Sequence, residues 1–87
     1  MKTPAIAITP RQLEVLEFIH STRIASGVSP TLTEVGEFLG VHKTTARDHV
    51  HALRVAGAVD STDTGTPRSI YVTDLGRAHL EQLRRPA

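Results

Sequence analysis

Apolar residues recur every three or four positions along four segments of the chain, which is the spacing of an amphipathic helix. The first segment begins at Thr9, a capping residue followed by Pro10, and Gln12 completes a capping box. Its apolar residues cover more than the usual stripe of a surface helix: Leu13, Val15, Leu16, Phe18 and Ile19. Part of this face therefore needs a partner, either the carboxy-terminal helix or the same surface of a second copy of the chain.

The second segment begins at Thr31, where Glu34 stands in position for another capping box. Its apolar residues share one face at spacings of three and four: Val35, Phe38 and Leu39. Gly40 follows the last of them and is a typical helix end. Gly36 lies inside the helix at a cost of about 1 kcal/mol relative to alanine. That cost predicts a neighbouring helix too close for a larger side chain.

Only Val41 and His42 separate this helix from a third one, predicted over residues 43–56. Its inward residues are Ala46, His49, Val50 and Leu53. Its outward residues are Lys43, Thr44, Arg47, Asp48, His51 and Arg54. Two short helices joined by a tight turn form a helix-turn-helix, here over residues 31–59, in which the second helix can lie against DNA.

The outward residues near the start of the third helix are types that bond base edges in a DNA major groove. Arginine reads guanine there, and a carboxylate accepts from cytosine. Unpaired amides at the start of a helix also favour phosphate. On an arbitrary amphipathic helix these residues would be only a solvated face. The helix and turn that precede them favour the DNA-binding interpretation.

Beyond Gly57 the pattern changes to alternation, and residues 58–61 and 68–72 predict two strands joined by the turn-rich segment 62–67. A hairpin directly after such a helix is the wing of a winged helix. Arg68 at its base can approach a phosphate or a neighbouring minor groove. It can equally be a charge that keeps an edge strand soluble. Both interpretations of Arg68 stay open.

A fourth helix is predicted after Thr73, its expected cap. Its apolar arc comprises Leu75, His79, Leu80 and Leu83. The predicted fold class is mainly α with a small β-hairpin: a winged helix-turn-helix with a three-helix core and a carboxy-terminal helix. We expect a flexible arm over residues 1–8, a winged-helix DNA-binding domain over 9–73, and the last helix and tail over 74–87.

Three stretches carry a family resemblance: TPRQLEVLEFI (9–19), SPTLTEVGEFLGV (29–41) and TTARDHVHALRVAGAV (44–59). They resemble the amino-terminal DNA-binding domain of the LexA repressor family, and their skeleton is also similar to winged-helix regulators of the MarR and ArsR kind. The resemblance implies that the base-reading residues are Lys43, Thr44, Thr45, Arg47, Asp48 and His51, with Arg68 in the wing. Thr31, at the start of the preceding helix, completes the set of candidate DNA-binding residues.

Two departures limit what the resemblance implies. The LexA family continues into a self-cleaving Ser-Lys protease domain, whereas residues 73–85 are more similar to the closing helix of MarR-type regulators. Repression controlled by self-cleavage is therefore not implied.

The composition fits a single small domain. The chain has 87 residues, of which 39% are hydrophobic, and contains no cysteine. It has no apolar run long enough for a secretory signal or a membrane span, so we expect a cytoplasmic, nucleoid-associated protein. Residues 1–40 hold three basic and four acidic side chains, and residues 41–87 hold seven and five, for a net charge of +1. Since one copy would neutralise few phosphates, we expect a homodimer.

The five histidines do not predict a metal site. His49 and His51 point to different helix faces, and neither His20 nor His42 has a carboxylate or histidine at a chelating helical spacing. We expect His49 to be a partly buried core residue and His51 to face solvent or DNA. Catalysis needs a nucleophile, a base and an anchored third group, and no such set is evident. We therefore expect no metal, no cofactor and no enzymatic activity.

The sequence thus predicts a sequence-specific regulator of transcription, acting as a repressor on double-stranded DNA. Helix 43–56 would read the major groove, and the hairpin over 58–72 would contact the backbone or the minor groove. The alternative is a winged helix used for protein contact in a chromosome or replication assembly, which the near-neutral charge leaves open.

Overall fold

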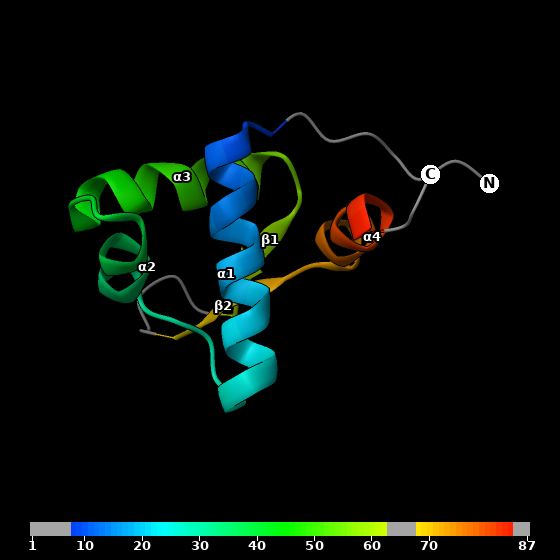
Figure 1. Cartoon of the computed structure of the whole chain (residues 1–87), viewed down its shortest axis with the longest axis horizontal. Coiled ribbons are helices and arrows are strands. Elements are labelled where there is room, and N and C mark those ends of the chain that lie inside the picture. Colours follow the sequence, from blue (N-terminus) through cyan, green and yellow to red (C-terminus); the bar gives the residue numbers. More distant parts are fainter. Residues whose placement is uncertain (1–7, 63–67, 85–87) are drawn as a thin grey trace.

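Four helices and one two-stranded hairpin make up the described part of the computed structural model, residues 8–62 and 68–84. The elements in order are α1 (Pro10–Ser26), α2 (Leu32–Leu39), α3 (Lys43–Val55), β1 (Val59–Ser61), β2 (Ile70–Val72) and α4 (Asp74–Arg84). Figure 1 shows α1 crossing the middle of the molecule, with α2 and α3 on one side and α4 on the other. The predicted fold class, mainly α with a small hairpin, is confirmed.

The first two helices begin with the predicted capping boxes. Thr9 Oγ1 accepts from the Gln12 amide at 3.1 Å, and the Gln12 side chain accepts from the Thr9 amide at 3.0 Å. At the start of α2, Thr31 Oγ1 accepts from the Glu34 amide at 3.1 Å, and Glu34 Oε1 accepts from the Thr31 amide at 2.8 Å. These bonds satisfy backbone donors that the first turn of a helix leaves free, which is why both helices begin where they do.

The core forms where α1 meets α2, α3 and the hairpin. Its fully buried side chains include Val15, Leu16, Ile19, Val35, Leu53 and Val59. The apolar face of α1 is therefore covered within the chain. Phe38 lies at the edge of the α2 face and stays 56% exposed, with its ring stacked on that of Phe18 at a centroid distance of 4.3 Å. Of the three apolar residues predicted to share one face of α2, Val35 and Leu39 are therefore buried, whereas Phe38 is covered only on the side that meets Phe18.

Other parts of the chain approach Gly36 closely, as predicted, but the neighbour is not the side of a passing helix. A Cβ atom there would lie 2.8 Å from the Val41 carbonyl oxygen and 3.5 Å from the Lys43 amide nitrogen. The crowding therefore comes from the backbone of the turn and the start of α3, rather than from the side of a passing helix. Gly40, with a φ of 73°, ends α2 in the left-handed conformation that glycine adopts at little cost.

The hairpin is antiparallel and pairs Val59 with Val72, Asp60 with Tyr71, and Ser61 with Ile70. Its strands are shorter than the predicted 58–61 and 68–72. The left-handed Gly57 (φ 82°) precedes β1, and Arg68, with a φ of 63°, precedes β2. Extended pairing therefore starts only beyond these two left-handed positions.

The last helix follows Thr73, whose Oγ1 accepts from the Gly76 amide at 3.1 Å, as expected of its cap. Of the predicted apolar arc, Leu80 is buried, whereas Leu83 is 55% exposed. The helix thus packs through its middle and leaves its last apolar residue uncovered.

Parts of the predicted organisation lie outside the described residues: most of the 1–8 arm, most of the 62–67 loop, and the tail beyond residue 84. Ile8, the described residue of the arm, packs partly against the core. None of the described helices combines the length and the apolar character needed to cross a membrane.

Gly76→Ala tests the packing of α4 on the hairpin. A Cβ atom there would overlap the Ala58 carbonyl oxygen and lie 2.8 Å from Val72 Cγ1. We expect the free energy of unfolding to fall by about 1–3 kcal/mol, although alanine is the better helix former. Urea unfolding measures the change, and Gln82→Ala on the exposed side of α4 is the control. Equal stability of the two variants would contradict this packing.

Candidate nucleic-acid interface

One face of α3 is buried and the other is open to solvent. Ala46, Val50 and Leu53 are buried against the rest of the core. The opposite residues are all exposed: Lys43, Thr44, Thr45, Arg47, Asp48 and His51. The predicted division of this helix is confirmed for these residues, with His49 half-buried at the boundary, and it fails for Arg54. The side chains named as base-reading candidates therefore lie together on the exposed face of α3. Figure 1 shows this helix at the outer edge of the molecule.

The start of α3 is held by a cap that sequence reasoning did not identify. His42 Nδ1 accepts from the Thr44 amide at 3.1 Å, and the Thr44 hydroxyl lies 3.1 Å from the same nitrogen. A residue assigned only to the turn thus supplies the acceptor that serine, threonine or aspartate usually provides. Its effect is to order the first turn of α3, which carries Lys43, Thr44 and Thr45.

Arg54, predicted to point outward from α3, is half-buried and turned onto the hairpin. Its Nη2 donates to Ser61 Oγ at 2.7 Å. Its Nε is buried and has no hydrogen-bond partner among the described residues. The expectation of a solvated side chain is therefore wrong here, because the hairpin folds back beside the last turns of α3. The bond connects the end of α3 to β1.

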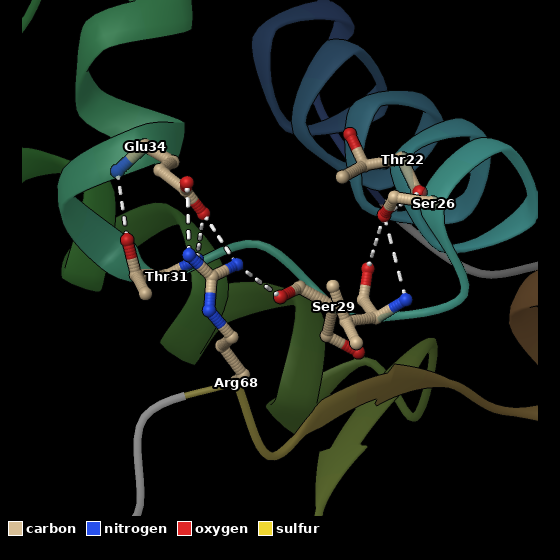
Figure 2. Close-up of polar contacts among 7 residues, drawn as sticks. Thr22, Ser26, Ser29, Thr31, Glu34 and Arg68 are labelled. Atoms are coloured by element: carbon tan, nitrogen blue, oxygen red, sulfur yellow. Dashed lines mark hydrogen bonds and ion pairs between the residues drawn. The ribbon is translucent and has the colours of Figure 1, made fainter.

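Arg68 makes a two-pronged ion pair with Glu34 at the start of α2. Its Nη1 and Nη2 lie 2.9 Å and 3.1 Å from Glu34 Oε1 and Oε2. Nη1 also donates to the Ser29 carbonyl oxygen at 3.1 Å. Figure 2 shows the guanidinium between these two acceptors. The contact of Arg68 with DNA stays a prediction, and the structure adds a second role within the chain.

Glu34 serves two interactions with one carboxylate. The hydrogen bond from the Arg68 guanidinium, and after it the one from the Thr31 amide, hold the pKa of the Glu34 carboxyl below its ordinary value. The group is therefore charged at neutral pH. The Thr31 hydroxyl accepts a hydrogen bond from the Glu34 amide and so caps α2. The predicted contact of Thr31 with DNA stays a prediction.

A groove of about 690 Å³ lies between the start of α2, α3 and the hairpin. The charged residues that line it include Lys43, Arg47, Asp48, Arg54 and Arg68. Four of these are basic and one is acidic, so the groove is cationic although the whole chain carries a net charge of only +1. Such a surface favours a polyanion.

A helix-turn-helix with an exposed second helix and a following hairpin defines a winged helix-turn-helix protein. The family model of the LexA DNA binding domain matches residues 6–69, and the chain belongs to this family. The resemblance to LexA noted in the sequence is confirmed.

The similar proteins include two that are named LexA repressors and one that is named a transcriptional regulator. The LexA repressor of Pediococcus pentosaceus is 39% identical over 70 residues, which is 79% of this chain and 33% of that protein. The LexA repressor of Pseudoalteromonas atlantica is 36% identical over 80 residues, which is 91% and 38% of the two chains. The chain thus spans about a third of the length of these relatives. The crystal structure of the M. tuberculosis transcriptional regulator MosR matches with a TM-score of 0.67 and 26% identity, over 88% of this chain and 53% of that one.

Sequence reasoning found the exposed face of α3 but missed the contacts that surround it. The Glu34–Arg68 pair spans 34 positions and the Arg68–Ser29 bond spans 39. No local pattern marks such contacts, because they depend on how the hairpin docks. The capping box gave a partial signal for the Glu34–Arg68 pair, because it placed the Glu34 carboxylate at the start of α2.

Arg68→Asn tests the ion pair directly, and asparagine tolerates the left-handed backbone of that position. The variant should raise the pKa of the Glu34 carboxyl toward its ordinary value, because it removes the largest cause of the lowering. A lowered pKa stabilises the fold at pH values above the unfolded pKa and stops doing so as pH falls through the folded pKa. The wild type should therefore lose more stability on acidification than the variant.

An NMR titration of the carboxyl carbons and urea unfolding at acidic and neutral pH measure these two effects. Arg77→Asn, which removes the ion-pair partner of Asp74 in α4, is the control. An unchanged pKa of Glu34 in Arg68→Asn would show that the pair does not form in solution.

Proposed function

We propose that this protein is a sequence-specific transcriptional repressor that binds double-stranded DNA and reads the major groove with α3. One observation carries the proposal: a rigid helix, buried on one side, exposes a continuous row of polar and charged side chains. Membership in the LexA DNA-binding-domain family and the names of its relatives support it. A protein with this role acts in the cytoplasm, at the nucleoid.

The chemistry of the exposed face suggests a division of roles. Arg47 is suited to donate two hydrogen bonds to guanine, and the adjacent Asp48 to accept from the amino group of cytosine. Lys43 and the free amides at the start of α3 are suited to phosphate. Thr44, Thr45 and His51 supply further donors and acceptors. The groove beside α3 would receive the sugar-phosphate backbone, because its cations attract phosphate.

We further propose that two copies bind together as a homodimer. With a net charge of +1, one copy neutralises too few phosphates for tight binding. Two recognition helices would enter half-sites about 10 bp apart, or a multiple of this. The apolar face of α1 is covered within the chain, whereas Leu83 on α4 is 55% exposed. The carboxy-terminal helix is therefore the favoured contact between copies.

Arg47→Ala should weaken binding to an operator selected from a randomised oligonucleotide pool by about 1–3 kcal/mol and relax the preference at one base pair. The reason is the loss of a two-pronged contact to one base. Fluorescence anisotropy on the operator and its single-base variants measures both effects. Glu17→Ala is the control, since it removes an exposed charged side chain of α1, outside both α3 and α4, and should not lower affinity. If Arg47→Ala bound every sequence as the wild type does, the assignment of Arg47 would be wrong.

The affinity for a random duplex should fall steeply as salt is raised, because bound cations release counterions from the phosphates. Titrations of one duplex over a series of salt concentrations give the slope. Lys43→Ala should make that slope smaller by about 1, since one phosphate contact is lost. A complete lack of binding at low salt would instead favour a winged helix that contacts another protein.

A further inference from the structure

The side chain of Arg68 connects the base of the hairpin to the helix-turn-helix. Arg68 reaches both the Glu34 carboxylate and the Ser29 carbonyl oxygen. Ser29 is 1% exposed, and its Oγ accepts from Arg23 Nη1 at 3.1 Å. Glu34 is held in turn by the Thr31 amide at 2.8 Å. Each acceptor of the guanidinium therefore belongs to a residue that a further hydrogen bond also holds.

The backbone of Arg68 adds independent evidence of a constraint at this point. Its φ of 63° lies in the left-handed region, where a residue with a side chain is uncommon. Such a conformation persists only when surrounding contacts hold it. Among the described residues, the contacts around it include the three hydrogen bonds of the guanidinium and, next along the chain, the bond from the Thr62 amide to the Ser69 carbonyl at 3.1 Å.

The other side of the hairpin is also connected to the helix-turn-helix. Arg54 of α3 donates to Ser61 at the end of β1. The two arginines thus join the hairpin to α3 through one strand and to α2 through the other. Both strands are therefore connected to the helix-turn-helix by side-chain hydrogen bonds, which add to the burial of Val59 and Ile70 in fixing the position of the hairpin beside the exposed face of α3.

We infer that Arg68 is a positioning residue, which holds the hairpin beside α3 through Glu34, and that its guanidinium is not itself a DNA contact. The inference rests on the proposed function and deepens it. The charge of Arg68 is partly offset by Glu34 at 2.9 Å, so its attraction for phosphate is weakened. If Arg68 turned to DNA, the Glu34 carboxylate would be left unpaired close to a polyanion.

A direct contact and a positioning role predict opposite effects of Glu34→Gln. Glutamine keeps the capping box, so α2 should still begin at the same residue. If Arg68 contacts phosphate, neutralising Glu34 frees the guanidinium and affinity rises. If Arg68 positions the hairpin, affinity falls although a negative charge has been removed. We expect a fall of roughly three- to tenfold on the selected operator.

Three variants make the comparison sharp. Glu37→Gln makes the same charge change on the exposed side of α2 and should not lower affinity. Arg68→Asn should lower affinity as much as Glu34→Gln does. The double variant should lower it no further, since each single variant already breaks the Arg68–Glu34 ion pair. Arg68→Lys should resemble Arg68→Asn, because an ammonium group lacks the two-pronged geometry but still binds phosphate. Retained affinity in Arg68→Lys, or tighter binding by Glu34→Gln than by Glu37→Gln, overturns the inference.

Amide hydrogen exchange without DNA separates this inference from the proposed function. In Glu34→Gln and Arg68→Asn, the Thr62 amide should exchange faster, because the hairpin next to Arg68 is less constrained. The Thr73 amide, which donates to the Ala58 carbonyl at the other end of the hairpin, is the internal reference and should be unchanged. Faster exchange at Thr62 in a protein that binds no duplex would support the positioning role and refute the proposed function. Unchanged exchange at Thr62 would refute the positioning role.

Discussion

Burial of the inner face of α3 sets the orientation of the exposed face that the proposed function uses. Ala46 and Leu53 are fully buried and Val50 is nearly so. Because a helix turns as a rigid unit, fixing these three positions also fixes the direction of every side chain on the opposite face. Apolar packing therefore fixes the orientation of the exposed side chains of α3, and no separate polar contact to each of them is needed. This rigidity is what a surface that reads base edges requires.

The turn before α3 is held equally tightly. The absence of a side chain at Gly36 lets the Val41 carbonyl approach α2, and the ring of His42 caps the helix that follows. α2 itself ends in a left-handed glycine, and Arg11 Nη2 of α1 donates to its last carbonyl, that of Leu39, at 2.7 Å. These contacts connect the end of α2, the turn and the start of α3.

Charge is organised locally rather than over the whole molecule. The net charge is only +1, yet basic side chains from α3 and the hairpin line one groove. Two of them, Arg54 and Arg68, also bond to Ser61 and Glu34 and so contribute to the shape of that groove. The same type of side chain thus supplies both the potential of the groove and the geometry that maintains it.

The helices, the caps of α1, α2 and α4, the two faces of α3 apart from Arg54, and the presence of a hairpin all follow from local sequence patterns. Capping and periodicity act over a few residues, so Thr9, Thr31 and Thr73 could be identified as caps without knowledge of the fold. The neighbour of Gly36, the exposure of Phe38 and the Arg68–Glu34 pair are known only from the folded structure. Those contacts join residues far apart in the chain, and they exist only once the core has set the distance between the hairpin and the helices.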